Sequence, residues 1–226
     1  MHVLFEQCGI RKDDKIAVMG KNNSNWVATY LATVTYGAII VPILQDFKAN
    51  DAIHIINHSG AKLLFISDAN WEGIEHDQIP AVMAVFSLGN WHPIAMREEL
   101  VANLTPEAIL GIFNSRYPDG YKPADVHYDE RLNNEVASIN YTSGTTGFSK
   151  GVVTPCNALA GNIRFALDSR LTFRGARHVT FLPLAHAYGC AFDFLSCLAA
   201  GGHTYLIGRT PSAKILLKAF AEVKPD

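Results

Sequence analysis

The sequence lacks three features that would place the chain in a special class of protein. No apolar run approaches the ~20 residues that a membrane-spanning helix needs. The net charge is only -2 at pH 7 and no basic stripe occurs, which argues against a partner made of nucleic acid. Charged side chains interrupt the first 14 residues, so no secretory segment is expected.

A disulfide framework is also missing. The four cysteines, Cys8, Cys156, Cys190 and Cys197, form no C-x-x-C pair in 226 residues. This predicts reduced thiols and a cytoplasmic location, and peripheral contact with a membrane is left open. The chain is 49% hydrophobic and 18% charged, values typical of a globular protein that buries a core without a metal or disulfide.

Short apolar runs alternate with segments of helical periodicity. Strands are expected at 15–20, 38–43, 62–67, 81–88, 136–141, 152–154, 177–182 and 204–207, and helices at 26–34, 50–59, 105–116, 157–167, 188–200 and from Thr210-Pro211 onward. Residues 117–134 are expected to form a long surface loop. The alternation predicts an α/β fold with mainly parallel sheets and helices on both faces. Pro42 is expected at a strand end or edge.

One stretch between two expected strands concentrates glycine and hydroxyl residues: Tyr141-Thr142-Ser143-Gly144-Thr145-Thr146-Gly147-Phe148-Ser149-Lys150-Gly151. Glycines let backbone N–H groups approach an anion, hydroxyls donate further hydrogen bonds, and the lysine supplies a positive charge. The composition therefore predicts a polyphosphate-binding loop. The alternative, a flexible loop without a ligand, explains the lysine–glycine pair between two strands less well.

Two generic motifs fail to match this stretch. The P-loop needs glycine where Ser149 stands and Ser or Thr where Gly151 stands. The nucleophile elbow G-x-S-x-G needs glycine where Tyr141 stands. A Walker-type nucleotidase and a serine hydrolase are therefore poor interpretations.

The stretch YTSGTTG-x-x-KG resembles the signature of the acyl-adenylate-forming superfamily, which includes acyl-CoA synthetases, firefly luciferase and adenylation domains of peptide synthetases. The resemblance implies that the loop holds the β- and γ-phosphates of ATP. The implied contacts are Thr142, Ser143, Gly144, Thr145, Thr146, Gly147 and Lys150. Mg²⁺ is expected through the ATP phosphates, with Thr146 as a candidate ligand and no other metal site. Ser149 replaces the usual proline, which predicts a more mobile loop.

A second landmark follows at Phe181-Leu182-Pro183-Leu184-Ala185-His186-Ala187-Tyr188-Gly189. It resembles the strand-end segment whose histidine lines the acyl pocket, and its PLAH form is similar to long-chain fatty acyl-CoA synthetases, with Gly189 in place of their usual glutamate. The resemblance implies that His186 and Lys150 are catalytic and that His186, Tyr188 and Gly189 bind substrate. The alternatives are a structural histidine and a core tyrosine.

The resemblance extends along nearly the whole chain and implies a domain organisation. Residues 1–226 are expected to form an incomplete N-terminal AMP-binding domain, part of the large N-terminal lobe. Residues 1–176 would be a first α/β subdomain, with the phosphate loop at 141–151, and residues 177–226 would start a second one. The C-terminal lid domain is expected to lie outside the chain, so the fragment alone is expected to be inactive.

The implied reaction is ATP-dependent activation of a carboxylic acid to an acyl-adenylate and then to acyl-CoA, with release of pyrophosphate and AMP. The acid that the resemblance favours is a long-chain fatty acid. The full-length protein would be an acid–thiol ligase acting on fatty acid, ATP and CoA. Two alternatives remain: an adenylation domain that loads an amino or aryl acid onto a carrier protein, and a non-catalytic nucleotide-binding relic. Acyl chain length and oligomeric state are left open.

Three further signals are read as structural. His54 and His58 are four residues apart, but Ile55 stands where the H-E-x-x-H zinc motif has glutamate, so a solvated helix face is expected. Asp193 is expected to be buried with a capping or hydrogen-bonding role. Cys190 and Cys197 are expected in the core.

Overall fold

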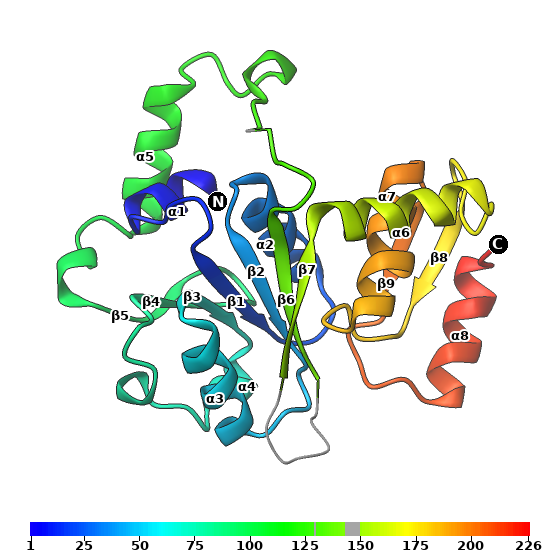
Figure 1. Ribbon diagram of the computed structural model, residues 1–226, viewed down its shortest axis with the longest axis horizontal. Helices are drawn as coiled ribbons and strands as arrows, with labels where there is room; N and C mark the ends of the chain where they lie inside the picture. Colours follow the sequence, from blue (N-terminus) through cyan, green and yellow to red (C-terminus); the bar gives the residue numbers. More distant parts are fainter. Residues whose placement is uncertain (129, 143–149) are drawn as a thin grey trace.

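The computed structural model of the chain describes residues 1–128, 130–142 and 150–226 (Figure 1). Its described residues form a large sheet of seven strands in the order β5-β4-β3-β1-β2-β6-β7 and a small sheet of β8 and β9. The large sheet consists of β1 (Lys15–Met19), β2 (Ile39–Ile43), β3 (Ala61–Ile66), β4 (Ala84–Ser87), β5 (Pro93–Met96), β6 (Val136–Thr142) and β7 (Lys150–Pro155). The small sheet pairs β8 (Arg177–Thr180) with β9 (His203–Leu206).

Helices connect the strands. Those before the β6–β7 hairpin are α1 (His2–Gln7), α2 (Ser24–Thr35), α3 (Ala49–Ser59), α4 (Asp68–Trp71) and α5 (Pro106–Arg116), with short 3₁₀ turns at His76–Gln78, Glu98–Leu100 and Pro123–Asp125. Those after it are α6 (Cys156–Asp168), a π-helix (Gly189–Leu195), α7 (Ser196–Ala200) and α8 (Ala213–Val223).

The large sheet is parallel except at its two edges. β1 pairs in parallel with β2 and β3, β3 with β4, and β2 with β6. β5 and β7 run antiparallel to their neighbours, while β8 and β9 are parallel. The structure confirms the α/β class with mainly parallel sheets.

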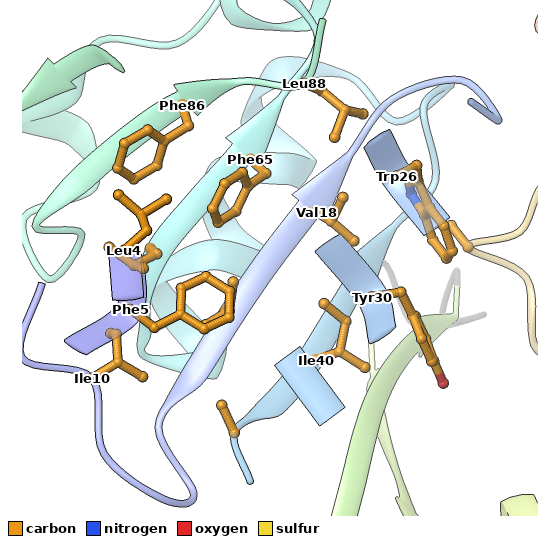
Figure 2. Close-up of a cluster of buried hydrophobic side chains, with 14 of the residues drawn as sticks. Leu4, Phe5, Ile10, Val18, Trp26, Tyr30, Ile40, Phe65, Phe86 and Leu88 are labelled. Atoms are coloured by element: carbon orange, nitrogen blue, oxygen red, sulfur yellow. The ribbon is translucent and has the colours of Figure 1, made fainter. Parts of the chain in front are cut away.

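Both faces of the large sheet are covered by apolar side chains. Along β1, Ile16 and Val18 belong to one buried cluster, and Ala17 and Met19 belong to the other. The first cluster lies beneath α1 and α2 and contains large aromatic residues, several of which Figure 2 shows: Phe5, Trp26, Tyr30, Phe65 and Phe86. The second lies beneath α3. Burial on both faces explains why these strands are continuous apolar runs in the sequence.

The helix boundaries follow from identifiable capping residues. Asn23 accepts a hydrogen bond from the N–H of Trp26 at 2.8 Å and begins α2. Thr105 caps α5 in the same way, with Pro106 at the first helical position. Gly60 ends α3 with a φ of +67°, a left-handed conformation that suits glycine. The start of α5 and the end of α3 lie within one residue of the prediction, and α2 begins two residues before it.

Pro42 is a correction to the sequence analysis, which placed it at a strand end or edge. It lies one residue before the end of β2, which is flanked by β1 and β6. The N–H of Ile39 donates to Asp14 on the β1 side, and successive N–H groups alternate between the two sides of a strand. Pro42 therefore faces β6, where the ladder is confined to the pair Ile40–Ser138, so its missing N–H breaks no ladder bond.

The elements after the hairpin show two more differences from the prediction. The expected helix at 188–200 is a π-helix followed by α7, and the hydroxyl of Ser196 donates to the carbonyl of Ala191 at 2.6 Å. The last helix begins at Ala213, capped by Ser212 rather than by Thr210. Among the described residues, no helix is both long and apolar enough to cross a bilayer.

The segment after the hairpin packs against the first apolar cluster. Phe194 of the π-helix contacts the rings of Trp26 and Tyr30 edge-on, with centroids 6.5 and 5.7 Å apart. Leu184, Ala185, Cys190 and Leu195 belong to the same cluster. The small sheet is thereby connected to α2 through one continuous core.

Candidate functional site

The proposed phosphate loop lies at the end of the β6–β7 hairpin. The last pair of the hairpin ladder joins Thr142 to Lys150, and both side chains are exposed. The contact residues Ser143, Gly144, Thr145, Thr146 and Gly147 lie outside the described residues, as does Ser149. The structure therefore describes the two strands that carry the loop and the first and last of its seven predicted contacts.

Two contacts fix the hairpin just before its end. Tyr141 is opposite Gly151, and a Cβ at Gly151 would lie 3.2 Å from the tyrosine ring and 3.0 Å from Ile139. The tyrosine hydroxyl and Nδ1 of His58 on α3 lie 2.7 Å apart in a hydrogen bond, and burial raises the pKa of Tyr141. Glycine at 151 thus allows the ring to cross the hairpin, and His58 anchors it to α3.

The hairpin end lies at the edge of the sheet where ligands of α/β proteins bind. β6 is parallel to β2, so Thr142 lies at the same edge as the carboxyl ends of β1 to β4. In open α/β sheets, ligands bind in the crevice outside the carboxyl ends of the strands. Figure 1 shows the hairpin between the rest of the large sheet and the small sheet.

His186 lies in the turn that follows β8. Its N–H donates to the carbonyl of Pro183 at 3.0 Å, and its own carbonyl accepts from Cys190. The imidazole is exposed, and its Nδ1 accepts the N–H of Tyr188 at 3.2 Å. That hydrogen bond favours the tautomer with the proton on Nε2.

The two predicted neighbours of His186 differ in their surroundings. Tyr188 is 54% exposed and contacts the ring of Phe192 at 4.9 Å, so its ring lies at the surface. Gly189 is buried, and a Cβ there would lie 2.7 Å from the carbonyl oxygen of Pro183. Gly189 therefore allows the π-helix to begin against the preceding turn.

Two asparagines join the His186 turn to the large sheet. Asn22, which follows β1, donates from Nδ2 to the carbonyl of Leu182 at 2.7 Å and accepts the N–H of Leu184 at 2.9 Å. Asn140 of β6 donates to the carbonyl of Ala185 at 3.3 Å. Since Asn140 is two residues before Thr142, the strand that carries one predicted site also contacts the turn that carries the other.

A cavity of about 430 Å³ lies beside this junction. It opens where the carboxyl ends of β1 and β2 face those of β8 and β9 and the start of α8. Its polar lining comes from both sheets and includes Lys21, Asn22, Gln45, Asp46, Arg209 and Ser212. The cavity therefore extends from the loops after β1 and β2 to those after β8 and β9.

The buried Cys190 thiol near the turn is poorly suited to proton transfer at neutral pH. Burial raises the pKa of the Cys190 thiol to about 12, so it carries almost no thiolate. Burial also raises the pKa of Asp193, and the hydroxyl of Thr204 donates to its main-chain carbonyl at 3.2 Å. Cys190 and Cys197 are core residues, as the sequence predicted.

His54 and His58, the two histidines predicted to lie on one helix face, contact each other, and His58 also contacts the hairpin. The rings of His54 and His58 lie 5.6 Å apart, and His58 bonds Tyr141. Within residues 1–128, 130–142 and 150–226, no group of three or more His, Cys, Asp or Glu side chains is placed to hold a metal ion. The expectation of a merely solvated face missed the contact with the hairpin.

Sequence reasoning also missed Asn22 and Asn140. Asn22 follows the first strand after Gly20, and Asn140 is a polar residue between Ile139 and Tyr141 in the strand before the glycine-rich stretch. Polar residues in those places are a detectable signal, because the carboxyl ends of parallel strands meet at one edge. Their common partner, some 45 to 160 residues away, has no local signature.

Comparison with known proteins gives a consistent match over the chain. The family described as "AMP-binding enzyme" matches residues 2–226. A putative acyl-CoA synthetase, YngI of Bacillus subtilis, is 28% identical over 208 residues, which are 85% of this chain and 37% of that protein. The long-chain-fatty-acid–CoA ligase FadD15 of Mycobacterium tuberculosis is 26% identical over 227 residues, covering 96% of this chain and 34% of that protein.

Solved structures share the fold. The anthranilate CoA ligase AuaEII in complex with anthranoyl-AMP superposes with a TM-score of 0.81 at 18% identity, covering 99% of this chain and 41% of that one. ATP-bound MatB from Rhodopseudomonas palustris gives 0.75 at 20% identity, covering 98% and 41%. The chain thus spans about a third of the length of these curated relatives.

Proposed function

Because the chain belongs to the AMP-binding enzyme family, we propose that the full-length protein activates a carboxylic acid with ATP and then transfers the acyl group to a thiol. A carboxylate oxygen forms a bond to the α-phosphorus, and pyrophosphate leaves with the electrons of the broken P–O bond. The CoA sulfur then attacks the acyl carbonyl and AMP leaves. The observation that carries this proposal is the YTSGTTG-x-x-KG stretch on a hairpin at the carboxyl edge of a parallel sheet.

The hairpin supports a role in holding phosphates. Thr142 and Lys150 are exposed and directly opposed at its end, so a hydroxyl and an ammonium group flank the start and finish of the loop. Lys150 would stabilise charge on the departing pyrophosphate. We propose Ser143, Gly144, Thr145, Thr146 and Gly147 as the intervening contacts. Mg²⁺ bound to the phosphates, with Thr146 as a candidate ligand, would supply charge neutralisation.

His186 is proposed to border the acid on the other side of the junction. The support is its exposed imidazole, held on a turn that contacts β6 through Asn140. Tyr188 and Gly189 are proposed as its neighbours at the acyl site. Residues 1–176 and 177–226 are proposed as the first and the beginning of the second subdomain, because the large sheet ends at Pro155 and β8 begins at Arg177.

A long-chain fatty acid is the proposed substrate class. Its support is the PLAH sequence ending at His186 and the match to FadD15, whose name states a long-chain fatty acid. Other relatives carry names that state different acids, including malonate. A cytoplasmic location is proposed with it, since the four cysteines are free thiols.

The test separates the two half-reactions in the full-length protein. Adenylation is measured as acid-dependent exchange of pyrophosphate into ATP, with palmitate, malonate, anthranilate and amino acids compared. Thiol transfer is measured as CoA-dependent consumption of synthetic acyl-adenylate. Lys150→Ala should slow adenylation on the order of 100-fold, about 3 kcal/mol, and slow thiol transfer far less, because pyrophosphate has already left.

A matched control is Lys218→Ala. Lys218 is an exposed lysine on α8 that pairs with Glu222 at 3.7 Å, and its removal should change neither half-reaction. Equal slowing of both steps by Lys150→Ala would contradict the phosphate assignment. Lack of exchange with every acid, together with ATP binding in a calorimetric titration, would instead indicate a nucleotide-binding relic.

A further inference from the structure

The side chain of Asn22 lies between the two sheets and is only 8% exposed. Its amide makes two hydrogen bonds with the segment after β8, one as donor to Leu182 and one as acceptor from Leu184. The main-chain oxygen of Asn22 also lies close to the segment after β9, since a Cβ at Gly208 would be 3.2 Å from that oxygen. Three parts of the chain thus converge on this residue.

The hydrogen-bond pattern is that of a strand neighbour. In a parallel ladder, one residue donates to the carbonyl before its partner and accepts from the N–H after it. Asn22 does the same with its side-chain amide across Pro183, which has no N–H of its own. A side-chain amide offers both a donor and an acceptor in this arrangement. The Asn22 side chain therefore makes with residues 182–184 the two hydrogen bonds that a neighbouring parallel strand would make.

The residues that Asn22 holds form the base of His186. Leu184 is fully buried and Ala185 is 7% exposed. The carbonyl of Pro183, between the two Asn22 contacts, accepts the N–H of His186. An exposed imidazole therefore stands on a short turn whose position is set from the large sheet.

We propose that Asn22 is a positioning residue that sets where His186 lies relative to the hairpin end at Thr142 and Lys150. The part of this proposal that concerns the reaction rests on the proposed function of His186. The part that concerns the turn does not depend on it, because Asn22 holds the turn whatever binds there.

The first measurement is hydrogen exchange by mass spectrometry on the full-length protein, comparing Asn22→Ala and Asn22→Asp with the wild type. Asn22→Ala leaves the Leu184 N–H without its acceptor, and we expect amides of residues 182–190 to exchange about ten-fold faster. Asn22→Asp keeps an acceptor for Leu184 but places a carboxylate oxygen against the Leu182 carbonyl in a position that is 8% exposed, so it should accelerate exchange in the same segment at least as much.

The matched control is Asn25→Ala. Asn25 also donates to two main-chain carbonyls, those of Leu88 and Gly89, at 3.0 and 2.8 Å. Both partners belong to the large-sheet side of the molecule. Its removal should speed exchange near residues 88–91 and leave residues 182–190 unchanged. If Asn22→Ala does not fold, the isosteric Asn22→Asp carries the comparison.

The second measurement is kinetic. In acid-dependent pyrophosphate exchange, Asn22→Asp should lower kcat and raise KM for the acid, by about ten-fold in kcat/KM, while KM for ATP stays within about two-fold. A merely structural loss would instead lower the amount of active enzyme with both KM values unchanged.

The outcomes separate the two proposals. Faster exchange confined to residues 182–190, with the KM split, supports Asn22 as a positioning residue. Uniform acceleration over the whole chain, or the same pattern in Asn25→Ala, overturns it. A wild type without pyrophosphate exchange overturns the proposed function, and the hydrogen-exchange pattern then still decides whether Asn22 holds the turn.

Discussion

Gly189 lies where the chain passes from the His186 turn into the π-helix. A Cβ at this position would be 2.7 Å from the Pro183 carbonyl oxygen, a backbone atom. Real Cβ atoms do not approach so closely, so the turn and the helix would have to separate. A glutamate side chain, which Gly189 replaces in the resemblance noted above, would have no room at this position.

Substitution of Gly189 tests this steric role. Gly189→Ala should reduce the free energy of unfolding by about 1–3 kcal/mol, because the added methyl group overpacks a buried contact. Urea unfolding of the full-length protein measures the change.

Gly161→Ala is the matched control for that measurement. Gly161 lies in α6 with no atom within 4 Å of its built Cβ. The substitution should stabilise by about 0.5–1 kcal/mol, because alanine has the higher helix propensity. Stabilisation by both substitutions would contradict the assigned contact at Gly189.

At the scale of elements, α1 and α5 are joined by an ion pair far from the site. Arg116 at the end of α5 donates two hydrogen bonds to the carboxylate of Glu6, at 2.6 and 3.1 Å. The hydrogen bonds from Arg116 lower the pKa of Glu6 below its usual 4.5. Figure 1 shows the two helices side by side at one end of the large sheet.

The pH dependence of this pair has a defined sign. The folded pKa of Glu6 is depressed, so its stabilisation is fully present above pH 4.5 and is lost as the pH falls through the folded value. The side chains are 41% and 36% exposed, so solvent screening limits the effect to below about 1 kcal/mol.

The measurement is the difference in unfolding free energy between wild type and Arg116→Met from pH 6 to pH 3, in low and high salt. The difference should shrink with acid and with salt. Arg164→Met is the control, because Arg164 and Asp168 are 78% and 58% exposed and should show no such trend. A difference that is constant with pH would refute the coupling.

The sequence predicted the long elements and also the four-residue strands β4, β8 and β9, but it missed several other short elements. Strands β1 to β3 are apolar runs, helices α2 and α3 have apolar periodicity, and Thr105-Pro106 marks the start of α5, so their type and approximate bounds were predictable. The four-residue strand β5 and six-residue α1 are too short for periodicity to identify. The π-helix at Gly189–Leu195 has the same apolar sequence pattern as an α-helix, so the pattern could not distinguish the two. The contacts particular to this segment are the Ser196 hydroxyl bond to Ala191 and the packing of Phe194 against Trp26, which only the structure shows.

At the scale of the whole molecule, the cysteines distinguish the interior from the surface. Cys8, Cys190 and Cys197 are at most 4% exposed, while Cys156 is half-buried. Burial raises the pKa of Cys8 and of Cys190 to about 12. The burial of three cysteines and the raised pKa of two of them predict that Cys156 is the one reactive thiol among the four in the native protein.

Thiol titration with a disulfide reagent at pH 8 measures this difference. Cys156 should react first, and this fast phase should be absent from the Cys156→Ser variant. The other three cysteines should react only at the rate of unfolding. Cys8 and Cys190 belong to the same buried cluster but to distant parts of the chain, so simultaneous reaction of their thiols would show that this cluster unfolds as one cooperative unit. Early reaction of Cys190 alone would show that the π-helix detaches first.

The site was predictable only in part, for a geometric reason. The YTSGTTG-x-x-KG and PLAH stretches carry local patterns, so the residues at 142, 150 and 186 could be named in advance. What joins the stretches is Asn140 of β6, whose partner Ala185 lies 45 residues further along the chain, while Asn22 holds the same turn through partners 160 and 162 residues away. Single-residue polar contacts over such separations leave no periodicity in a sequence and required the structure.

The separation between Asn22 and Leu184 also sets an order of events during synthesis. At about 5–20 residues per second on the ribosome, roughly 8–30 s pass between the emergence of the two residues. Over that interval Trp26 and Tyr30 lack Phe194, the side chain that covers them in the finished protein. The nascent chain therefore presents the Trp26 and Tyr30 rings of α2 without their later cover, an exposed apolar surface of the kind that chaperones bind.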